Sequence, residues 1–225
     1  MALPADTELG LSAEDVLTTT RSVRKRLDFE RPVPKELLTD CVRVALQAPS
    51  GSNRWLMQFV IVTDRERREA LAAVYRAAYE QYRQIPTYIG SVDKGTPERN
   101  ASQQRTSASA DYLAENMHRA PALVLACAMG RPDNGPAIAK TTLLGSVMPG
   151  MWSFMLAARA RGLGTSWTSV SLFREQETAD VVGIPIDEVT IAALSPVAYT
   201  KGTDFRPAMR PDPAEVIHWE QWGRR

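Results

Sequence analysis

The chain has 225 residues and a formal net charge of +1, and 44% of its residues are apolar and 24% charged. This length fits one large domain or two small ones, with a core large enough to enclose a small ligand. A net charge so close to zero gives no general reason to expect nucleic-acid binding.

The cysteines and the first residues indicate the compartment. Cys41 and Cys127 are the only two cysteines. Both stand in apolar patterns, so we interpret them as small buried hydrophobic residues, although a disulfide stays open. The N-terminus carries Asp6 and Glu8 and lacks an apolar run after a basic start. We therefore expect no secretory signal and predict a cytoplasmic protein.

The first half of the chain is predicted to form helices around one strand. A capping box at Ser12 opens a helix that runs towards Arg24, and Pro34 starts a second helix, which Pro49 ends. The expected strand is 58–63, and a helix over 64–82 follows it. Residues 83–105 are rich in Pro, Gly and polar groups, which predicts a surface loop or a mobile lid.

The second half alternates helices and strands. The predicted helices are 106–118, an uncharged one that ends at Gly162, and 174–182; the predicted strands are 122–128, a segment after Gly164, and 190–195. The stretch between Lys140 and Arg159 has no charge and is nearly long enough to cross a membrane. Its Ser, Thr, Pro and Gly residues favour a buried helix, or one at a subunit interface.

The tail and the alternation of elements complete the prediction. From Tyr199 the chain is expected to be irregular, and it ends in an aromatic segment, 216–222, with two tryptophans. Such a segment is costly to leave in water, so we expect it to pack on a partner subunit. The alternation of about four strands with helices, taken alone, predicts an α/β fold.

Three segments carry candidate chemistry. Arg21–Arg26 holds four cations and Ser22, which suits a phosphate, although for this segment taken alone a solvated basic helix face is the better explanation. In Ala48–Asn53, small residues would let backbone groups approach the edge of a flat polar ring, and Asn53 could supply both a donor and an acceptor. An ordinary turn is the alternative interpretation. Gly162–Ser169 is not a dinucleotide fingerprint, because Trp167 takes the third glycine position and a helix precedes the segment.

Other chemistries find little support in the sequence. His118 and His218 are the only histidines, so His and Cys residues offer no metal-ligand cluster. No Ser-His-acid set has motif context. Ser91 and Lys94 have the spacing of some serine acyl-enzymes, but the companion motifs are lacking and chance explains the spacing better.

Together, these segments resemble the nitroreductase family in order and spacing. Arg21-Ser22-Val23-Arg24 is similar to its opening motif, and Ala48-Pro49-Ser50-Gly51-Ser52-Asn53 with the following strand to its second. Ala120-Pro121 before an aliphatic strand, the segment leading to Gly162-Leu163-Gly164, and Arg210 before the aromatic tail also fit. The resemblance implies one α+β domain over residues 1–225. Its sheet would be mixed or antiparallel with about four strands, and residues 83–105 would form a lid-like insertion.

The resemblance also implies an intertwined homodimer with FMN at the interface and a tail wrapped around the partner. Arg21, Ser22, Arg24 and Arg210 would hold the FMN phosphate and the neighbouring flavin edge. Pro49, Ser50, Gly51 and Asn53 would line the ribityl chain and the ring, and Thr168, Ser169 and Val170 would lie near the reactive edge.

Three departures from the family pattern are visible. Thr20 stands where the family often has another arginine, so the phosphate grip would shift to Arg21 and Arg210. Trp55-Leu56-Met57 replaces the usual Gln-Pro-Trp. The 83–105 insertion has no clear counterpart, and Tyr79, Tyr82 and Tyr88 are candidate contacts for the acceptor.

The implied function is transfer of electrons from NAD(P)H through FMN to nitroaromatic or quinone-like acceptors, by a ping-pong mechanism without a dedicated acid or base. The open alternatives are a flavin-binding storage or sensor protein, a family branch that performs dehalogenation or flavin breakdown, and a hydrolase that uses Ser91. The sequence does not choose between NADH and NADPH.

Overall fold

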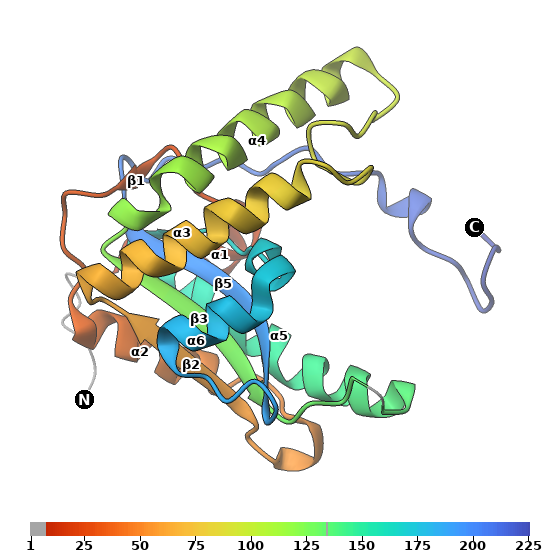
Figure 1. Ribbon diagram of the computed structural model, residues 1–225. Coiled ribbons are helices and arrows are strands. Elements are labelled where there is room, and N and C mark those ends of the chain that lie inside the picture. Colours follow the sequence, from red (N-terminus) through yellow and green to blue (C-terminus); the bar gives the residue numbers. More distant parts are fainter. Residues whose placement is uncertain (1–7, 134) are drawn as a thin grey trace.

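A five-stranded antiparallel sheet forms the centre of the computed structural model, which describes residues 8–133 and 135–225 (Figure 1). The strands are β1 (Leu27–Asp28), β2 (Met57–Val62), β3 (Ala122–Met129), β4 (Leu163–Thr165) and β5 (Val189–Thr200). Their order is β1-β5-β3-β2, and β4 also pairs with β5. Every pairing between these strands is antiparallel.

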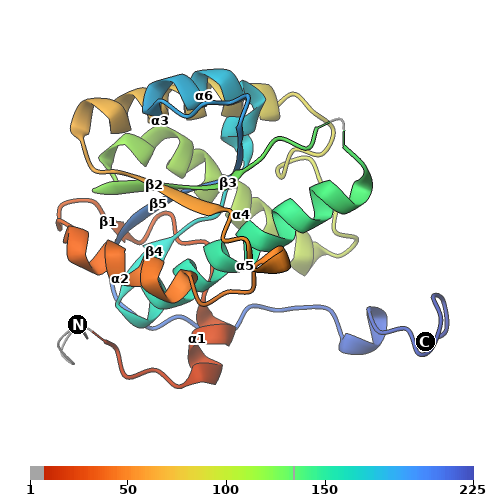
Figure 2. The ribbon, with the colours of Figure 1, turned by 90° about the horizontal axis from the view of Figure 1, so that it is seen from below.

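Helices cover both faces of the sheet (Figure 2). One layer contains α2 (Lys35–Ala45) and α5 (Ala137–Ala160), with α1 (Ala13–Thr19) beside it. The opposite layer contains α3 (Arg65–Tyr82), α4 (Pro97–Asn116) and α6 (Glu175–Val182). Strand β3 explains the two layers, because Val124 faces the α2–α5 side and Leu125 the α3–α4 side, and both are fully buried.

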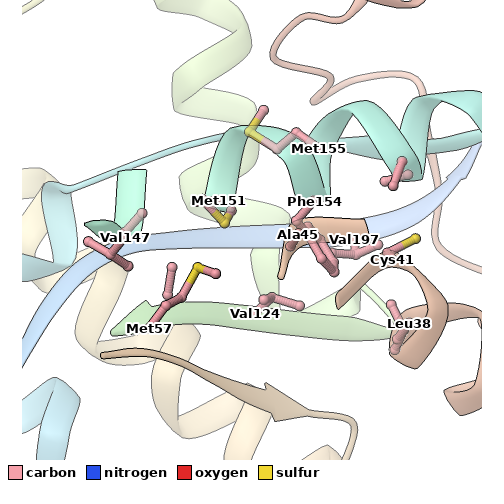
Figure 3. Close-up of a cluster of buried hydrophobic side chains, with 14 of the residues drawn as sticks. Leu38, Cys41, Ala45, Met57, Val124, Val147, Met151, Phe154, Met155 and Val197 are labelled. Carbon is pink, nitrogen blue, oxygen red and sulfur yellow. The ribbon is translucent and has the colours of Figure 1, made fainter. Parts of the chain in front are cut away.

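The layer that contains α2 and α5 is tightly packed against the sheet (Figure 3). Met151 and Phe154 of α5 lie over the sheet, and Cys41 of α2 lies in the same cluster. Gly150 lets α5 approach its neighbours, since a Cβ there would collide with the Met57 side chain and lie 3.4 Å from the Ala45 carbonyl. The interpretation of Cys41 and Cys127 as buried free thiols is confirmed.

The structure confirms the α+β fold with an antiparallel sheet, while the α/β pattern interpretation was wrong. A chain that alternates helices and strands still makes antiparallel pairs when its strands enter the sheet in opposite directions. Several boundaries also differ from prediction. The helix expected to run towards Arg24 ends at Thr19, β1 was missed, and β5 extends from Val189 to Thr200.

The 83–105 segment is only partly irregular. Helix α4 begins at Pro97, with Thr96 as its N-cap, so residues 97–105 are helical and the expectation of a loop there was wrong. The helix has no large apolar residue in its first half, and the hydrophobic spacing that identifies a helix is therefore missing from the sequence.

The uncharged stretch forms the middle of α5, as expected, and much of it is buried. No helix in residues 8–133 and 135–225 has the length and apolar character of a membrane span. Beyond Lys201 the chain is irregular: Phe205 still packs on the core, and the last residues extend away from the body (Figure 1). The tail exposes 62% of Trp219 and 89% of Trp222, so its aromatic surface is uncovered within one chain.

Candidate functional site

The basic segment after α1 lies against β4 at Ser22 and Val23 and then turns at Arg24–Arg26. Ser22 forms a parallel bridge with Thr165, and the Val23 backbone N–H donates to the Thr165 carbonyl at 2.7 Å. The Val23 side chain is buried in the core on the α3–α4 side of the sheet. Arg21, Ser22 and Arg24, which flank Val23 in the chain, line a cavity outside the core.

That cavity, here called the arginine cavity, has a volume of about 540 Å³. Four arginines line it, together with hydroxyl side chains and two tryptophans. They are Arg21, Arg24, Arg105, Arg210, Thr20, Ser22, Ser102, Thr106, Ser109, Trp152 and Trp167, with Met155 and Ala208 completing the wall. The structure thus brings Arg21, Ser22, Arg24 and Arg210 together from opposite ends of the chain, in line with the sequence expectation.

These arginines lack acidic partners. Arg24 donates to the Ser109 hydroxyl at 3.2 Å, and Arg21 donates to the Arg206 carbonyl at 3.3 Å. Among the described residues no carboxylate lines the cavity and none forms an ion pair with its four guanidinium groups. Burial lowers the pKa of Arg24, which shows the cost of holding this charge away from water. An anionic ligand would offset that cost.

Arg105 is a cavity residue that the sequence interpretation missed. It lies on α4, within the segment predicted to be a loop. Thr20, which replaces an arginine of the family motif, donates its hydroxyl to the Val16 carbonyl at 2.6 Å and closes α1. Arg105 therefore supplies from α4 a cation that position 20 lacks. The Thr96-Pro97 helix start is the sequence signal that would have placed Arg105 on a helix.

A second cavity, here called the tyrosine cavity, adjoins the first and has a volume of about 300 Å³. Arg24 and Trp167 line both cavities. Its other walls come from three sources: α3 with α4, the loop after α3, and the segment after β4. These residues are Tyr75, Tyr79, Tyr82, Ile85, Ile89, Ala110, Ser166, Thr168, Ser169, Val170 and Phe173. The predicted group Thr168, Ser169 and Val170 therefore lies beside Arg24.

Most hydroxyl groups of the tyrosine cavity have partners within the chain. Tyr75 shares a hydrogen bond with Thr168 at 3.3 Å, and Tyr82 accepts from the Ile89 backbone N–H at 2.9 Å. Tyr79 donates to Asp111 at 3.0 Å. Burial, together with that hydrogen bond, raises the pKa of Tyr79. The three tyrosines thus form an aromatic wall whose hydroxyl groups are hydrogen-bonded within the chain, beside the cation of Arg24.

Of the three tyrosines proposed to contact an acceptor, two line this cavity and one does not. Tyr79 and Tyr82 are in its wall, whereas Tyr88 supports them from behind, with its ring 5.3 Å from that of Tyr82. The Tyr88 hydroxyl donates to Asp111 at 3.2 Å. Ser166 differs from the tyrosines, because its buried hydroxyl has no partner among the described residues.

The Pro49–Asn53 segment lies apart from both cavities in the fold. A short 3-10 turn, Gly51–Asn53, packs on the first half of α5, where the Gly51 N–H donates to the Ser146 hydroxyl at 2.9 Å. Ser52 and Asn53 adopt positive φ values of 52° and 54°. These residues, Pro49 and Ser50 included, line neither the arginine cavity nor the tyrosine cavity. One chain therefore assembles two of the three predicted groups.

An α+β fold with a cationic cavity beside an aromatic one defines a protein suited to a phosphorylated aromatic ligand. The chain belongs to the nitroreductase family, whose model matches residues 17–199.

Solved structures share this fold at low sequence identity. A nitroreductase-like family protein from Bacillus cereus is 19% identical, with a TM-score of 0.66 over 96% of this chain and 98% of that one. The FMN- and NADPH-dependent nitroreductase NfnB from sphigopyxis sp. strain HMH is 20% identical, with a TM-score of 0.68 over 94% and 100% of the chains. Iodotyrosine deiodinase bound to FMN and 3-iodo-L-tyrosine is 20% identical, with a TM-score of 0.68 over 93% and 99%.

Proposed function

We propose that this protein is an FMN-dependent oxidoreductase that takes electrons from NAD(P)H and passes them to nitroaromatic or quinone-like acceptors. One observation carries the proposal. Arg21, Ser22, Arg24 and Arg210 converge on a single cavity that contains no carboxylate among the described residues. Two structures with the same fold are described as FMN-bound or FMN-dependent, which supports the same cofactor here.

The residues present fit FMN chemically. A phosphate dianion suits the guanidinium groups of Arg21, Arg105 and Arg210 and the Ser22 hydroxyl, because arginine forks onto phosphate oxygens. The volume of about 540 Å³ lies within the range of small-molecule cavities, about 300–1,000 Å³. The flavin ring would extend towards Arg24, with Thr168, Ser169 and Val170 near its reactive edge.

The chain's own contribution to the reaction is binding and electrostatics. FMN, when bound, supplies the redox chemistry by accepting a hydride and passing electrons to an acceptor. Arg24, held by Ser109 at the junction of the two cavities, favours a ligand that gains negative charge there without rearrangement. The tyrosine wall would exclude water and offer flat surfaces to an aromatic acceptor. No dedicated acid or base side chain is needed for this role.

A homodimer would complete the site. The Pro49, Ser50, Gly51 and Asn53 segment, which is apart from both cavities in one chain, would then reach the ribityl chain and ring from the second subunit. Exposed Met148 and Trp152 on α5 and the uncovered tryptophans of the tail support such an interface.

We also propose that the chain forms one domain, that the 83–105 region covers the site, and that the protein is cytoplasmic.

The likeness to iodotyrosine deiodinase favours dehalogenation as the second candidate. Both candidates use the same cofactor, so product analysis with a nitroarene and an iodophenol separates them. A flavin-binding storage or sensor protein would bind FMN but would not turn over NAD(P)H with either acceptor.

The test is anaerobic spectroscopy of the purified protein. We expect a yellow protein that bleaches with NADPH or NADH and recovers its colour when a nitroarene is added. A yellow protein that stays oxidised with both nucleotides would support the storage or sensor alternative. A colourless protein that takes up no added FMN would contradict the proposal.

A further inference from the structure

A third cavity lies beyond the arginine cavity, between the start of α4 and the tail. This outer basic cavity has a volume of about 460 Å³ and is lined by Lys94, Arg99 and Arg210, among others. It shares Ser102, Thr106 and Arg210 with the arginine cavity, so the two are continuous. Among the described residues, no carboxylate lines the outer basic cavity.

The turn that carries Lys94 is held in place by its own hydrogen bonds. The Lys94 N–H donates to the Asn100 side chain at 2.7 Å, and Thr96 accepts from the Arg99 N–H at 3.3 Å as the helix cap. These bonds fix Lys94 beside the first turn of α4, which carries Arg99. Asp93, which precedes Lys94, accepts from the Gly95 N–H and the Asn100 amide at 2.9 Å and 2.8 Å. Its carboxylate is therefore engaged within the turn.

The number of cations exceeds what one phosphate requires. Arg21, Arg105 and Arg210 already suffice for the phosphate of FMN in the arginine cavity. Lys94 and Arg99 line only the outer cavity and form no ion pair among the described residues. A second group of cations next to the first suits a second phosphate on another ligand.

We propose that the outer basic cavity binds the 2′-phosphate of NADPH, and that the protein therefore prefers NADPH to NADH. This inference rests on the proposed function, in which a nicotinamide nucleotide reaches the same site as FMN. NADH and NADPH differ only by that phosphate, so Lys94 and Arg99 distinguish the two donors without touching the reacting ring. Arg210 links the two phosphate subsites, because it lines both cavities.

The test uses the FMN-loaded protein and two single variants, Lys94→Gln and Arg99→Gln. Wild type is expected to show at least a tenfold higher kcat/KM for NADPH than for NADH. Each variant should lower the NADPH value by about tenfold, the effect of one charge-assisted hydrogen bond, and leave the NADH value within about twofold. Arg67→Gln, which removes an exposed cation of α3 outside these cavities, is the matched control and should change neither value.

A binding measurement gives a readout without turnover. Calorimetry should show that wild type binds 2′,5′-ADP at least tenfold more tightly than 5′-AMP, and that Arg99→Gln removes this difference. Equal use of NADH and NADPH by wild type would overturn the proposal, and so would loss of FMN affinity in Arg99→Gln, since the cavity would then serve the FMN phosphate. A wild type that binds no FMN would instead refute the proposed function, while tighter 2′,5′-ADP binding would still support the subsite.

Discussion

The two adjoining cavities differ in how far their polar groups are satisfied by the chain itself. In the tyrosine cavity, Tyr75, Tyr79 and Tyr82 each have a hydrogen-bond partner, so these tyrosines need no ligand to satisfy them, while the Ser166 hydroxyl has no partner among the described residues. In the arginine cavity, the guanidinium groups of Arg21 and Arg24 have neutral partners only. The difference indicates that the tyrosine cavity selects by shape, whereas the arginine cavity depends on a negatively charged ligand for its stability.

The largest effect is expected from removing charge in the arginine cavity. The double variant Arg21→Gln/Arg210→Gln should weaken FMN binding by about 100- to 10,000-fold, because each charge-assisted contact contributes about 1.5–3 kcal/mol. Fluorescence titration of the apoprotein with FMN measures this. The same titration of Arg67→Gln, whose cation lies outside the cavities, should give the wild-type affinity. Unchanged binding in the double variant would mean that the phosphate is held elsewhere.

The second effect concerns the core and its pH dependence. Burial raises the pKa of both Cys41 and Cys127 to about 12, from an ordinary value of 9.0. An unfolded chain loses these protons near pH 9, whereas the folded chain keeps them until about pH 12. The free energy of unfolding should therefore fall as pH rises above 9, by about 1.4 kcal/mol per thiol and pH unit.

Urea unfolding at pH 8 and pH 10 measures this loss. The Cys41→Ala/Cys127→Ala variant supplies the control, since its lower stability should depend less on pH over the same interval. If the variant and the wild type lose equal stability between these pH values, the thiols are not the cause.

A smaller effect is expected at Arg105. The Arg105→Gln variant should weaken FMN binding by about tenfold, because this arginine replaces the cation that Thr20 does not provide. FMN binding should also slow amide hydrogen exchange in α4 of wild type and less so in the variant. Arg99→Gln is the matched comparison on the same helix and should retain the wild-type FMN affinity. Equal affinities of Arg105→Gln and wild type would show that Arg105 does not hold the cofactor.

The smallest effect is expected in the tyrosine cavity. Tyr79→Phe removes one hydrogen bond to Asp111, which keeps Arg83 at 2.8 Å and Tyr88 at 3.2 Å as partners. Stability should fall by about 1 kcal/mol, as measured by urea unfolding, and FMN affinity should be unchanged. A drop in FMN affinity larger than the drop in stability would show that this hydroxyl binds the cofactor and would reverse the contrast between the cavities.

The sequence was sufficient for the features that depend on local pattern. The capping box at Ser12, the aliphatic strand β3 and the uncharged helix α5 were all predicted close to their observed positions. The meeting of Arg21 with Arg210 was also expected, although only from the family resemblance.

Features that depend on distant contacts escaped the sequence. Strand β1 has two residues and exists only because it pairs with the end of β5. The first half of α4 has no apolar stripe, so Arg105 was assigned to a loop. The direction of strands in a sheet is not encoded in their spacing along the chain, which is why the pattern alone suggested α/β.

The most direct test of the central claim compares FMN with riboflavin, which lacks the phosphate. Titrating the apoprotein with each flavin isolates the contribution of the arginine cavity, because the ring and ribityl chain are shared. We predict that FMN binds at least about 100-fold more tightly than riboflavin, and that added salt reduces this ratio. Equal affinity for the two flavins would contradict the assignment of the cavity to a flavin phosphate.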